Sequence, residues 1–381
     1  MPTAKVVLLK TRPETVLDDY GRAMELAGYR DAIPASRETV IKLNLSWTLY
    51  YPACSTQPWQ LDGVLGKLRA DGYAADALHA VENKTVVTDP WEGAWNNKWL
   101  PVLERHGLKM NALPEMEWEV FPFKSPLLKL NEIFPQGIKV PKLFAGKNVL
   151  HLPTVKTHGH STMTGAIKNA FGGLLMEVRH YAHEFMHEVL VDLLYMQKEL
   201  HPGMLAVMDG AVAGDGAGPR TMTPRVMDVV LASSDMVAID ATAARLMGFD
   251  PMTIPYLRMA HERGLGVAEA RDIEIAGESL ESLAQRFSTK RSFVIWGDQM
   301  LRKGPLRPFK RLALHSPLMV WAPFASWAFH DLLWYPTIGR RHIRDFERTG
   351  WGKLWASYAT GPRPEKHVYH NVEKWQRHMA K

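Results

Sequence analysis

Basic side chains at alternate positions form the stretch of this sequence best suited to chemistry. Lys156, His158 and His160 follow Pro153, which ends an apolar run. Side chains two residues apart on an extended backbone share one face, so these three should project together just beyond a strand. Imidazoles exchange protons near neutral pH, and an ammonium group attracts anions. The spacing predicts Lys156, His158 and His160 as catalytic residues acting on a carboxylate or phosphate.

A helix is expected to follow this row, over residues 162–176. Its N-terminal end would carry positive partial charge and favour an anion. Lys168 and Asn169 lie inside this helix and are predicted to bind the substrate. An exposed loop with solvated Lys and His side chains is the alternative interpretation.

A second motif, H-E-x-x-H, places His183 and His187 four residues apart. On a helix both imidazoles would share one face, as in zinc metalloproteases. Position 190 is Leu, so the extended motif with a Gly and a third His is absent, and Glu199 and His180 are only distant candidates for a further ligand. The motif raises the hypothesis of a divalent metal site at His183 and His187, with an ordinary helix as the alternative.

A glycine-rich segment, 208–220, follows a strongly apolar run and is expected to be a loop. Asp209 at its start is predicted to orient a histidine and is counted with the catalytic residues. Gly216 and Gly218 are predicted to lie against the substrate, because glycine allows close approach to the backbone. The segment has neither Walker A nor G-x-G-x-x-G spacing, and a flexible surface loop is the alternative.

Polar residues also mark two other strand ends. Lys42 and Asn44 flank Leu43 at the end of an apolar run and are predicted to bind substrate. Asp235 follows another such run and is predicted either to bind substrate or simply to cap the next helix. Asp240, within that helix, is expected to be buried and paired.

The elements that would position these side chains alternate between strands and helices. Such alternation predicts an α/β fold, with a mostly parallel sheet sandwiched by helices and a ligand crevice at the carboxyl ends of the strands. Residues 89–137 have no clear order of elements. The expected strands are 5–9, 39–43, 77–81, 148–152, 205–208, 229–232 and 273–275, and the expected helices are 14–27, 59–70, 162–176, 181–200, 235–247 and 254–263.

Four segments in this order and spacing resemble the family known as domain of unknown function 362. They are KLNLSW (42–47), LPTVKTHGHSTMTGAIKNAFGG (152–173), VMDGAVAGDGAGP (207–219) and LASSDMVAIDATAARLMGFDP (231–251). The resemblance covers about residues 5–280. It implies an α/β fold with Lys156, His158, Lys168, Asn169, Asp209 and Asp235 near one site. Many members carry a ferredoxin-like part with two iron–sulfur clusters, whereas this chain has a single cysteine, Cys54. It therefore has no self-ligated iron–sulfur cluster, and a redox role would need an external electron carrier.

Charge divides the 381 residues into two expected domains, an α/β body (1–289) and a helical, Trp-rich extension (290–381). The extension holds 17 Lys and Arg against 6 Asp and Glu, and 7 of the 13 Trp residues, so it is suited to an anionic partner. Its aromatic run, 318–335, has basic residues on both sides. That arrangement predicts contact with a membrane surface through residues 315–344, with packing on the body as the alternative. The Trp residues are not interleaved with basic ones, so nucleic acid is not expected.

Three functions are compatible with these patterns. The leading hypothesis is an enzyme that acts on a small anionic substrate by Lys/His acid–base chemistry or with externally supplied electrons. The substrate could also be hydrophobic and reach the enzyme from the membrane. The second is a non-catalytic membrane-peripheral binding protein, and the third is a His-ligated metal-dependent hydrolase. An enzyme should bury the 156–160 strand end, and residues 89–137 are a candidate lid. The short apolar run at the N-terminus is not typical of a signal peptide, so a cytoplasmic, partly membrane-associated location is expected.

Overall fold

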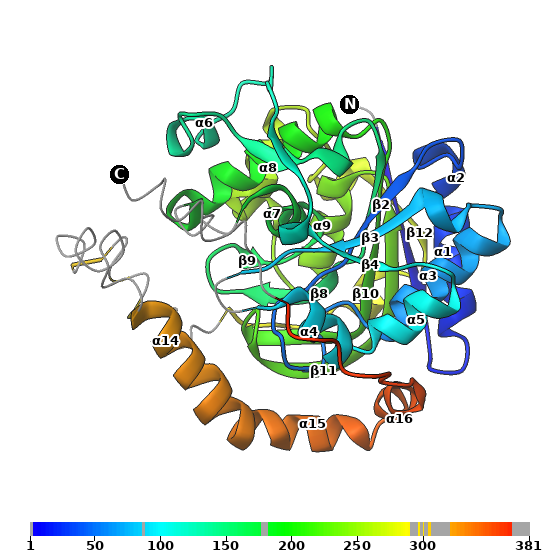
Figure 1. The fold of residues 1–381 in the computed structure, drawn as a ribbon. Coiled ribbons are helices and arrows are strands. Elements are labelled where there is room, and N and C mark those ends of the chain that lie inside the picture. The colour runs from blue at the N-terminus through cyan, green and yellow to red at the C-terminus, as the bar shows by residue number, and fades with distance from the viewer. Residues whose placement is uncertain are drawn as a thin grey trace.

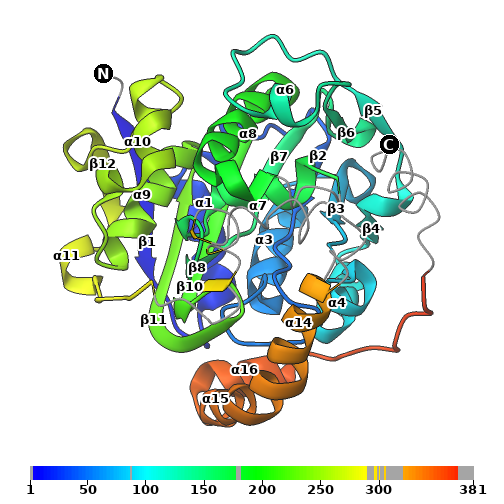
Figure 2. The ribbon, with the colours of Figure 1, turned by 90° about the vertical axis from the view of Figure 1, so that its left-hand side faces the viewer.

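The structure is a computed structural model that describes residues 3–85, 88–176, 182–289, 296–297, 300, 304–305 and 321–367. A large sheet lies at its centre, and helices cover both faces (Figures 1 and 2). The predicted α/β fold is thus confirmed.

The sheet is mostly parallel. Its strands are β1 (Ala4–Lys10), β2 (Thr39–Lys42), β3 (Leu78–Glu82), β4 (Met110–Ala112), β7 (Asn148–His151), β8 (Thr154–His158), β9 (Thr162–Met163), β10 (Met204–Ala217), β11 (Thr221–Ser233) and β12 (Ile273–Gly277). The order along the main path is β12-β1-β11-β10-β7-β2-β3-β4, and β8 pairs with β10 and β9. On that path only β11 runs antiparallel to its neighbours. A separate pair joins β5 (Trp118–Val120) to β6 (Lys139–Pro141).

Helices lie on both faces because successive apolar side chains of the strands point to opposite sides. In β1, Val6 and Leu8 belong to one core cluster, whereas Val7 and Leu9 belong to the other. The first cluster is shared with α7 (Ala166–Leu174), α8 (Met186–Leu200), α9 (Met236–Leu246) and α10 (Pro255–Glu262), and the second with α1 (Val16–Leu26), α3 (Pro58–Ala70) and α5 (Trp99–Arg105). The smaller helices are α2 (Tyr29–Ala32), α4 (Pro90–Asn96), α6 (Leu130–Ile133) and α11 (Leu280–Leu283).

The glycine-rich segment is a strand, which corrects the expected loop. β10 continues through it to Ala217 and pairs with β11 over nearly its whole length. Glycine is needed where another strand packs closely against this segment. A Cβ on Gly218 would lie 1.8 Å from the Thr157 carbonyl oxygen. Hydrogen bonding to a partner strand, which local composition does not reveal, decides the conformation here.

Two expected helix starts are also wrong. The helix expected from 162 begins at Ala166, because Thr162 and Met163 first pair with β8 as β9. The helix expected from 181 begins as α8 at Met186, so His183 precedes it. His180 lies outside the described residues.

The described part of the C-terminal extension is helical. α14 (Trp321–Trp327), a π-helical stretch η9 (Ala328–Gly339) and α15 (Arg340–Glu347) run end to end, and α16 (Gly350–Ser357) follows. In Figure 1 they lie along the lower edge of the body and are coloured orange. None of the helices in the described ranges is long and apolar enough to cross a membrane. Residues 315–320 of the predicted membrane-contact segment lie outside those ranges.

Candidate functional site

Ionisable side chains come together at the carboxyl ends of three neighbouring strands, β2, β3 and β7. Lys42 ends β2 and Glu82 ends β3, and both side chains are buried. The Lys42 Nζ atom lies 2.8 and 2.9 Å from the two carboxylate oxygens of Glu82. Glu82 is not among the residues predicted from the sequence. It could have been predicted, because Lys42 and Glu82 have opposite charges and end two successive strands.

Asn169 connects this ion pair to the end of the third strand, β7. Its side-chain amide donates to the Lys42 carbonyl at 3.0 Å and lies 3.3 Å from Nδ1 of His151. The other ring nitrogen of His151 lies 2.6 Å from the Gln197 side-chain oxygen. Burial lowers the pKa of His151 to about 3, so its ring is neutral. Asn169 therefore positions buried polar groups at the strand ends.

Lys156 is the second buried lysine, with none of its side chain exposed. Its Nζ donates to Cys54 O at 2.9 Å, to Thr154 Oγ1 at 2.7 Å, and to Asn44 Oδ1. All three acceptors are neutral oxygens. Burial lowers the pKa of Lys156 to about 8, so its ammonium group gives up a proton much more readily than an exposed lysine does.

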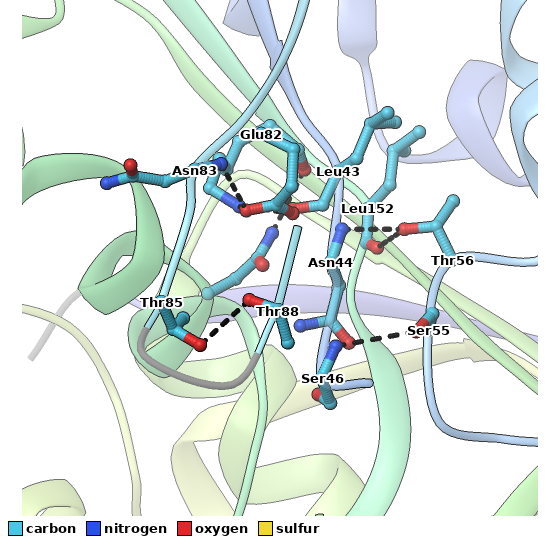
Figure 3. A network of polar contacts seen from close by, with 12 residues as sticks. Leu43, Asn44, Ser46, Ser55, Thr56, Glu82, Asn83, Thr85, Thr88 and Leu152 are labelled. Atoms are coloured by element: carbon cyan, nitrogen blue, oxygen red, sulfur yellow. Dashed lines mark hydrogen bonds and ion pairs between the residues drawn. The ribbon is translucent and has the colours of Figure 1, made fainter. Parts of the chain in front are cut away.

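The loop between β2 and α3, residues 43–57, covers Lys156. Thr56 Oγ1 accepts from the Asn44 backbone N–H and donates to Leu152 O, both at 2.8 Å (Figure 3). This bridge fixes Asn44 next to the end of β7. The strand end is buried as far as His158, whereas Gly159 and His160 are half-buried. Residues 43–57 cover it, whereas the expected lid 89–137 contacts the outer side of that loop through Thr48.

Three imidazoles and a second lysine gather beyond the end of β8. The ring centroids of His158 and His160 are 5.9 Å apart, and those of His160 and His183 are 5.8 Å apart. His183 also packs edge-on against Phe171, and Lys168 Nζ lies 5.4 Å from the centre of that same ring. The predicted neighbours Lys156, His158, His160 and Lys168 are therefore brought together, and His183 joins them. We call His158, His160, His183 and Lys168 the histidine–lysine cluster.

His158 is buried and electrically neutral. Burial lowers its pKa well below the ordinary value, and the basic neighbours Lys168, His160, His183 and Lys156 lower it further. Its Nδ1 accepts a hydrogen bond from the His160 backbone N–H at 3.1 Å. A neutral ring that accepts at Nδ1 carries its proton on Nε2. His158 can consequently donate one hydrogen bond, from Nε2–H.

The part of the chain that carries these strand ends matches a known family. Residues 39–245 match the family described as Domain of unknown function (DUF362). This chain belongs to that family. It is also 31% identical over 129 residues to a thylakoid-associated protein of Synechocystis sp. (strain ATCC 27184 / PCC 6803 / Kazusa), a match that covers 32% of this chain and 39% of that relative. No solved structure matches significantly.

In this member of the DUF362 family, Asp209 lies away from the histidines. Its carboxylate accepts from Tyr20 OH at 3.0 Å and from the Ala211 backbone N–H at 2.9 Å, on the face of the sheet covered by α1 and α3. Burial raises the pKa of Asp209 to about 6. The expectation that Asp209 orients a histidine is therefore not supported by its contacts.

The N-terminus of α7 is already occupied, which corrects its expected role in anion binding. Asp240 accepts hydrogen bonds from the backbone N–H groups of Ala166 at 2.6 Å and Ile167 at 3.2 Å. A Cβ on Gly165 would collide with the Asp240 carboxylate. Asp240 is buried and paired, as expected, and it fixes the helix that carries Lys168 and Asn169.

Asp235 caps α9, the alternative role considered for it. Its carboxylate accepts from the backbone N–H groups of Val237, Ala238 and Val267. Gly216 adopts a φ of +112°, which strongly favours glycine, and Gly218 packs against Thr157. These contacts give structural roles to Asp235, Gly216 and Gly218, three of the seven residues predicted to bind substrate.

The two imidazoles of the H-E-x-x-H motif have different surroundings. His183 precedes α8 and contacts His160 and Phe171, whereas His187 stacks on Tyr256 at 6.1 Å. In the part of the chain that the structure describes, no three His, Cys, Asp or Glu side chains are placed to hold a metal ion. Among the described residues, the metal-site hypothesis therefore has no third ligand; the candidate His180 lies outside them.

Proposed function

We propose that this protein is an enzyme that binds a small anionic substrate at the histidine–lysine cluster and transfers a proton to or from it. The observation that carries the proposal is the convergence of His158, His160 and Lys168 beyond the end of β8. A carboxylate or phosphate there would interact favourably with the Lys168 ammonium and accept a hydrogen bond from His158 Nε2–H.

His160 is the residue we assign to proton transfer. The ring of His158 is neutral and its Nδ1 is engaged, so it is suited to holding the anion. His160 is half-buried next to it, with its ring 5.9 Å away. An imidazole in this position reaches a substrate held by His158 and Lys168, and imidazoles exchange protons near neutral pH.

Binding is tested first, with inorganic phosphate and a series of monocarboxylates as probes in isothermal titration calorimetry. Lys168→Gln should weaken binding at least tenfold, because it removes a charge-assisted contact worth about 1.5–3 kcal/mol. The matched control is Lys142→Gln, which removes an exposed lysine paired with Glu117 elsewhere. Equal affinities of wild type and Lys168→Gln, or no binding of any probe, contradict the proposed site.

Turnover is tested separately by deuterium exchange. NMR in D₂O follows exchange of the C–H next to the carboxylate in the monocarboxylates that bind. The wild-type protein should catalyse exchange, and His160→Gln should lose it while still binding the anion. Binding without exchange in both proteins would favour the second hypothesis, a non-catalytic binding protein. Reduction by an external electron carrier would instead give turnover that depends on an added reductant.

We also propose that the protein associates with a membrane surface. The relative is described as thylakoid-associated, although the match covers only 39% of its length. The basic, Trp-rich composition of residues 290–381 supports the same location.

A further inference from the structure

Large apolar side chains are concentrated on the outer face of the continuous helix formed by α14, η9 and α15, residues 321–347, which we call the C-terminal helix. Of the ten large hydrophobic residues exposed in the described parts of the chain, five lie within one stretch of fifteen residues. They are Phe324 (63% exposed), Trp327 (44%), Leu332 (58%), Leu333 (60%) and Ile338 (50%). We call these five residues the apolar face. Such a concentration on one helix is typical of an interaction surface.

The opposite face of the same helix is anchored to the body. His330 and Trp334 are buried, and Trp47 of the 43–57 loop packs against both rings. Trp47 Nε1 donates to Asp331 at 2.9 Å, and Tyr51 OH lies 2.7 Å from His342 Nδ1. The helix is therefore held in place by its inner side, and the apolar face points away from the body without any rearrangement.

Positive charge continues the apolar face along the helix. Arg340, Arg341 and Arg344 are exposed in α15, immediately after Ile338. Figure 1 shows α14 and α15 at the edge of the molecule, outside the layers of the body. An in-plane membrane helix has this composition, with Trp, Phe and Leu in the acyl boundary and arginines near the headgroups.

We infer that the apolar face and Arg340, Arg341 and Arg344 bind the surface of an anionic lipid bilayer. The inference rests on the membrane association proposed above and identifies its surface, but it is independent of the anion site. Charge favours a bilayer over a second copy of the chain. Residues 290–381 contain 17 basic and 6 acidic residues, so the extensions of two copies would both be positively charged and would repel each other. Anionic headgroups carry the opposite charge and would attract them.

The test is co-sedimentation of the full chain with phosphatidylcholine vesicles, with and without phosphatidylglycerol. The wild-type protein should bind the anionic vesicles. Leu332→Glu/Leu333→Glu should bind at least 100-fold more weakly, because two exposed apolar side chains that would enter the bilayer become charged. Leu17→Glu/Leu26→Glu is the matched control, since these two leucines of α1 are also exposed (42% and 39%), and it should bind like wild type.

The arginines are tested by a second variant, Arg340→Gln/Arg341→Gln/Arg344→Gln. It should lose roughly 100-fold in affinity for anionic vesicles at low ionic strength and much less at high ionic strength. This variant keeps the test decisive if the double glutamate variant folds poorly, as judged by circular dichroism.

The outcomes separate the two proposals. If the wild-type chain binds neither kind of vesicle, both the membrane association and this surface are wrong. If the wild-type chain binds and both helix variants bind as tightly as it does, the membrane association stands and the assigned surface is wrong. If sedimentation equilibrium shows a dimer that Leu332→Glu/Leu333→Glu dissociates, and vesicles do not bind, the apolar face is an interface between copies and the inference is overturned.

Discussion

The titration of Lys156 tests a feature of the strand end next to the histidine–lysine cluster, a fully buried ammonium group with three neutral acceptors. Burial disfavours the charged form, whereas the oxygens of Asn44, Cys54 and Thr154 favour it. With a pKa of about 8 in the folded protein, burial is the larger effect. The folded protein then releases this proton before the unfolded chain does, whose lysine has a pKa of about 10.4.

The sign of the pH dependence follows from that difference. Between about pH 8 and pH 10.4 the unfolded state holds the proton and the folded state does not, so stability rises with pH in this window. From about pH 7 to about pH 9.5 the gain is about 1.5 pH units at 1.36 kcal/mol each, or about 2 kcal/mol. For a chain of this length that corresponds to roughly 2–3 °C in Tm.

The comparison variant is Lys156→Met, which keeps most of the side-chain volume and cannot titrate. The stability of this variant at neutral pH does not by itself show whether Lys156 is charged, because opposing contributions nearly cancel. Removing the buried charge recovers about 3 kcal/mol, but three buried acceptors each lose a donor at about 1–3 kcal/mol. The difference between the two pH values cancels these constant contributions and the titration of other groups.

The assay is a thermal melt of both proteins at about pH 7 and about pH 9.5. We expect the Tm of the wild type to shift upward by roughly 2–3 °C relative to the shift of Lys156→Met. Equal shifts would mean that Lys156 stays protonated in this window. The three oxygen acceptors would then outweigh burial, and the site would hold a permanent cation.

Three further predictions concern the groups around Lys156. Glu82→Gln removes the carboxylate from the buried Lys42 pair and should cost about 3–5 kcal/mol, and adding Lys42→Met should recover most of the loss in the same melt. Asp240→Ala removes the acceptor at the start of α7 and should cost about 1–3 kcal/mol, with faster amide hydrogen exchange at Ile167 than in wild type. Gly218→Ala brings a Cβ against a backbone carbonyl and should cost more than about 3 kcal/mol, whereas Gly66→Ala, whose added Cβ would meet no atom closer than 3.7 Å, should cost much less.

The strand ends were accessible from the sequence because each is a local pattern. An apolar run followed by Lys42 or by Lys156 and His158 predicts a polar group at the carboxyl end of a strand. Parallel strands place such ends on one edge of the sheet. The structure places Lys42, Asn44, Lys156 and His158 at or just beyond such strand ends, and their catalytic and substrate-binding roles stay predictions. The same reasoning also gave the α/β fold.

The remaining errors come from contacts between residues far apart in the chain. The N-terminus of α7 is filled by Asp240, more than 70 residues further along, which no local pattern indicates. The same holds for Asp209, whose partner Tyr20 lies 189 residues away. Glycines suggested a loop at 208–220, but pairing with β11 makes this segment a strand. Long-range hydrogen bonds overrode the local preference in each case.

The loop 43–57 lies between buried Lys156 and the C-terminal helix that carries the proposed membrane surface. On its inner side, Asn44 and Cys54 supply two of the three acceptors for Lys156. On its outer side, Trp47 and Tyr51 hold the C-terminal helix. A change in the position of that helix therefore acts on a loop that contributes directly to the environment of Lys156. Because removing one acceptor weakens the stabilisation of the ammonium form, displacement of this loop should lower the pKa of Lys156 further.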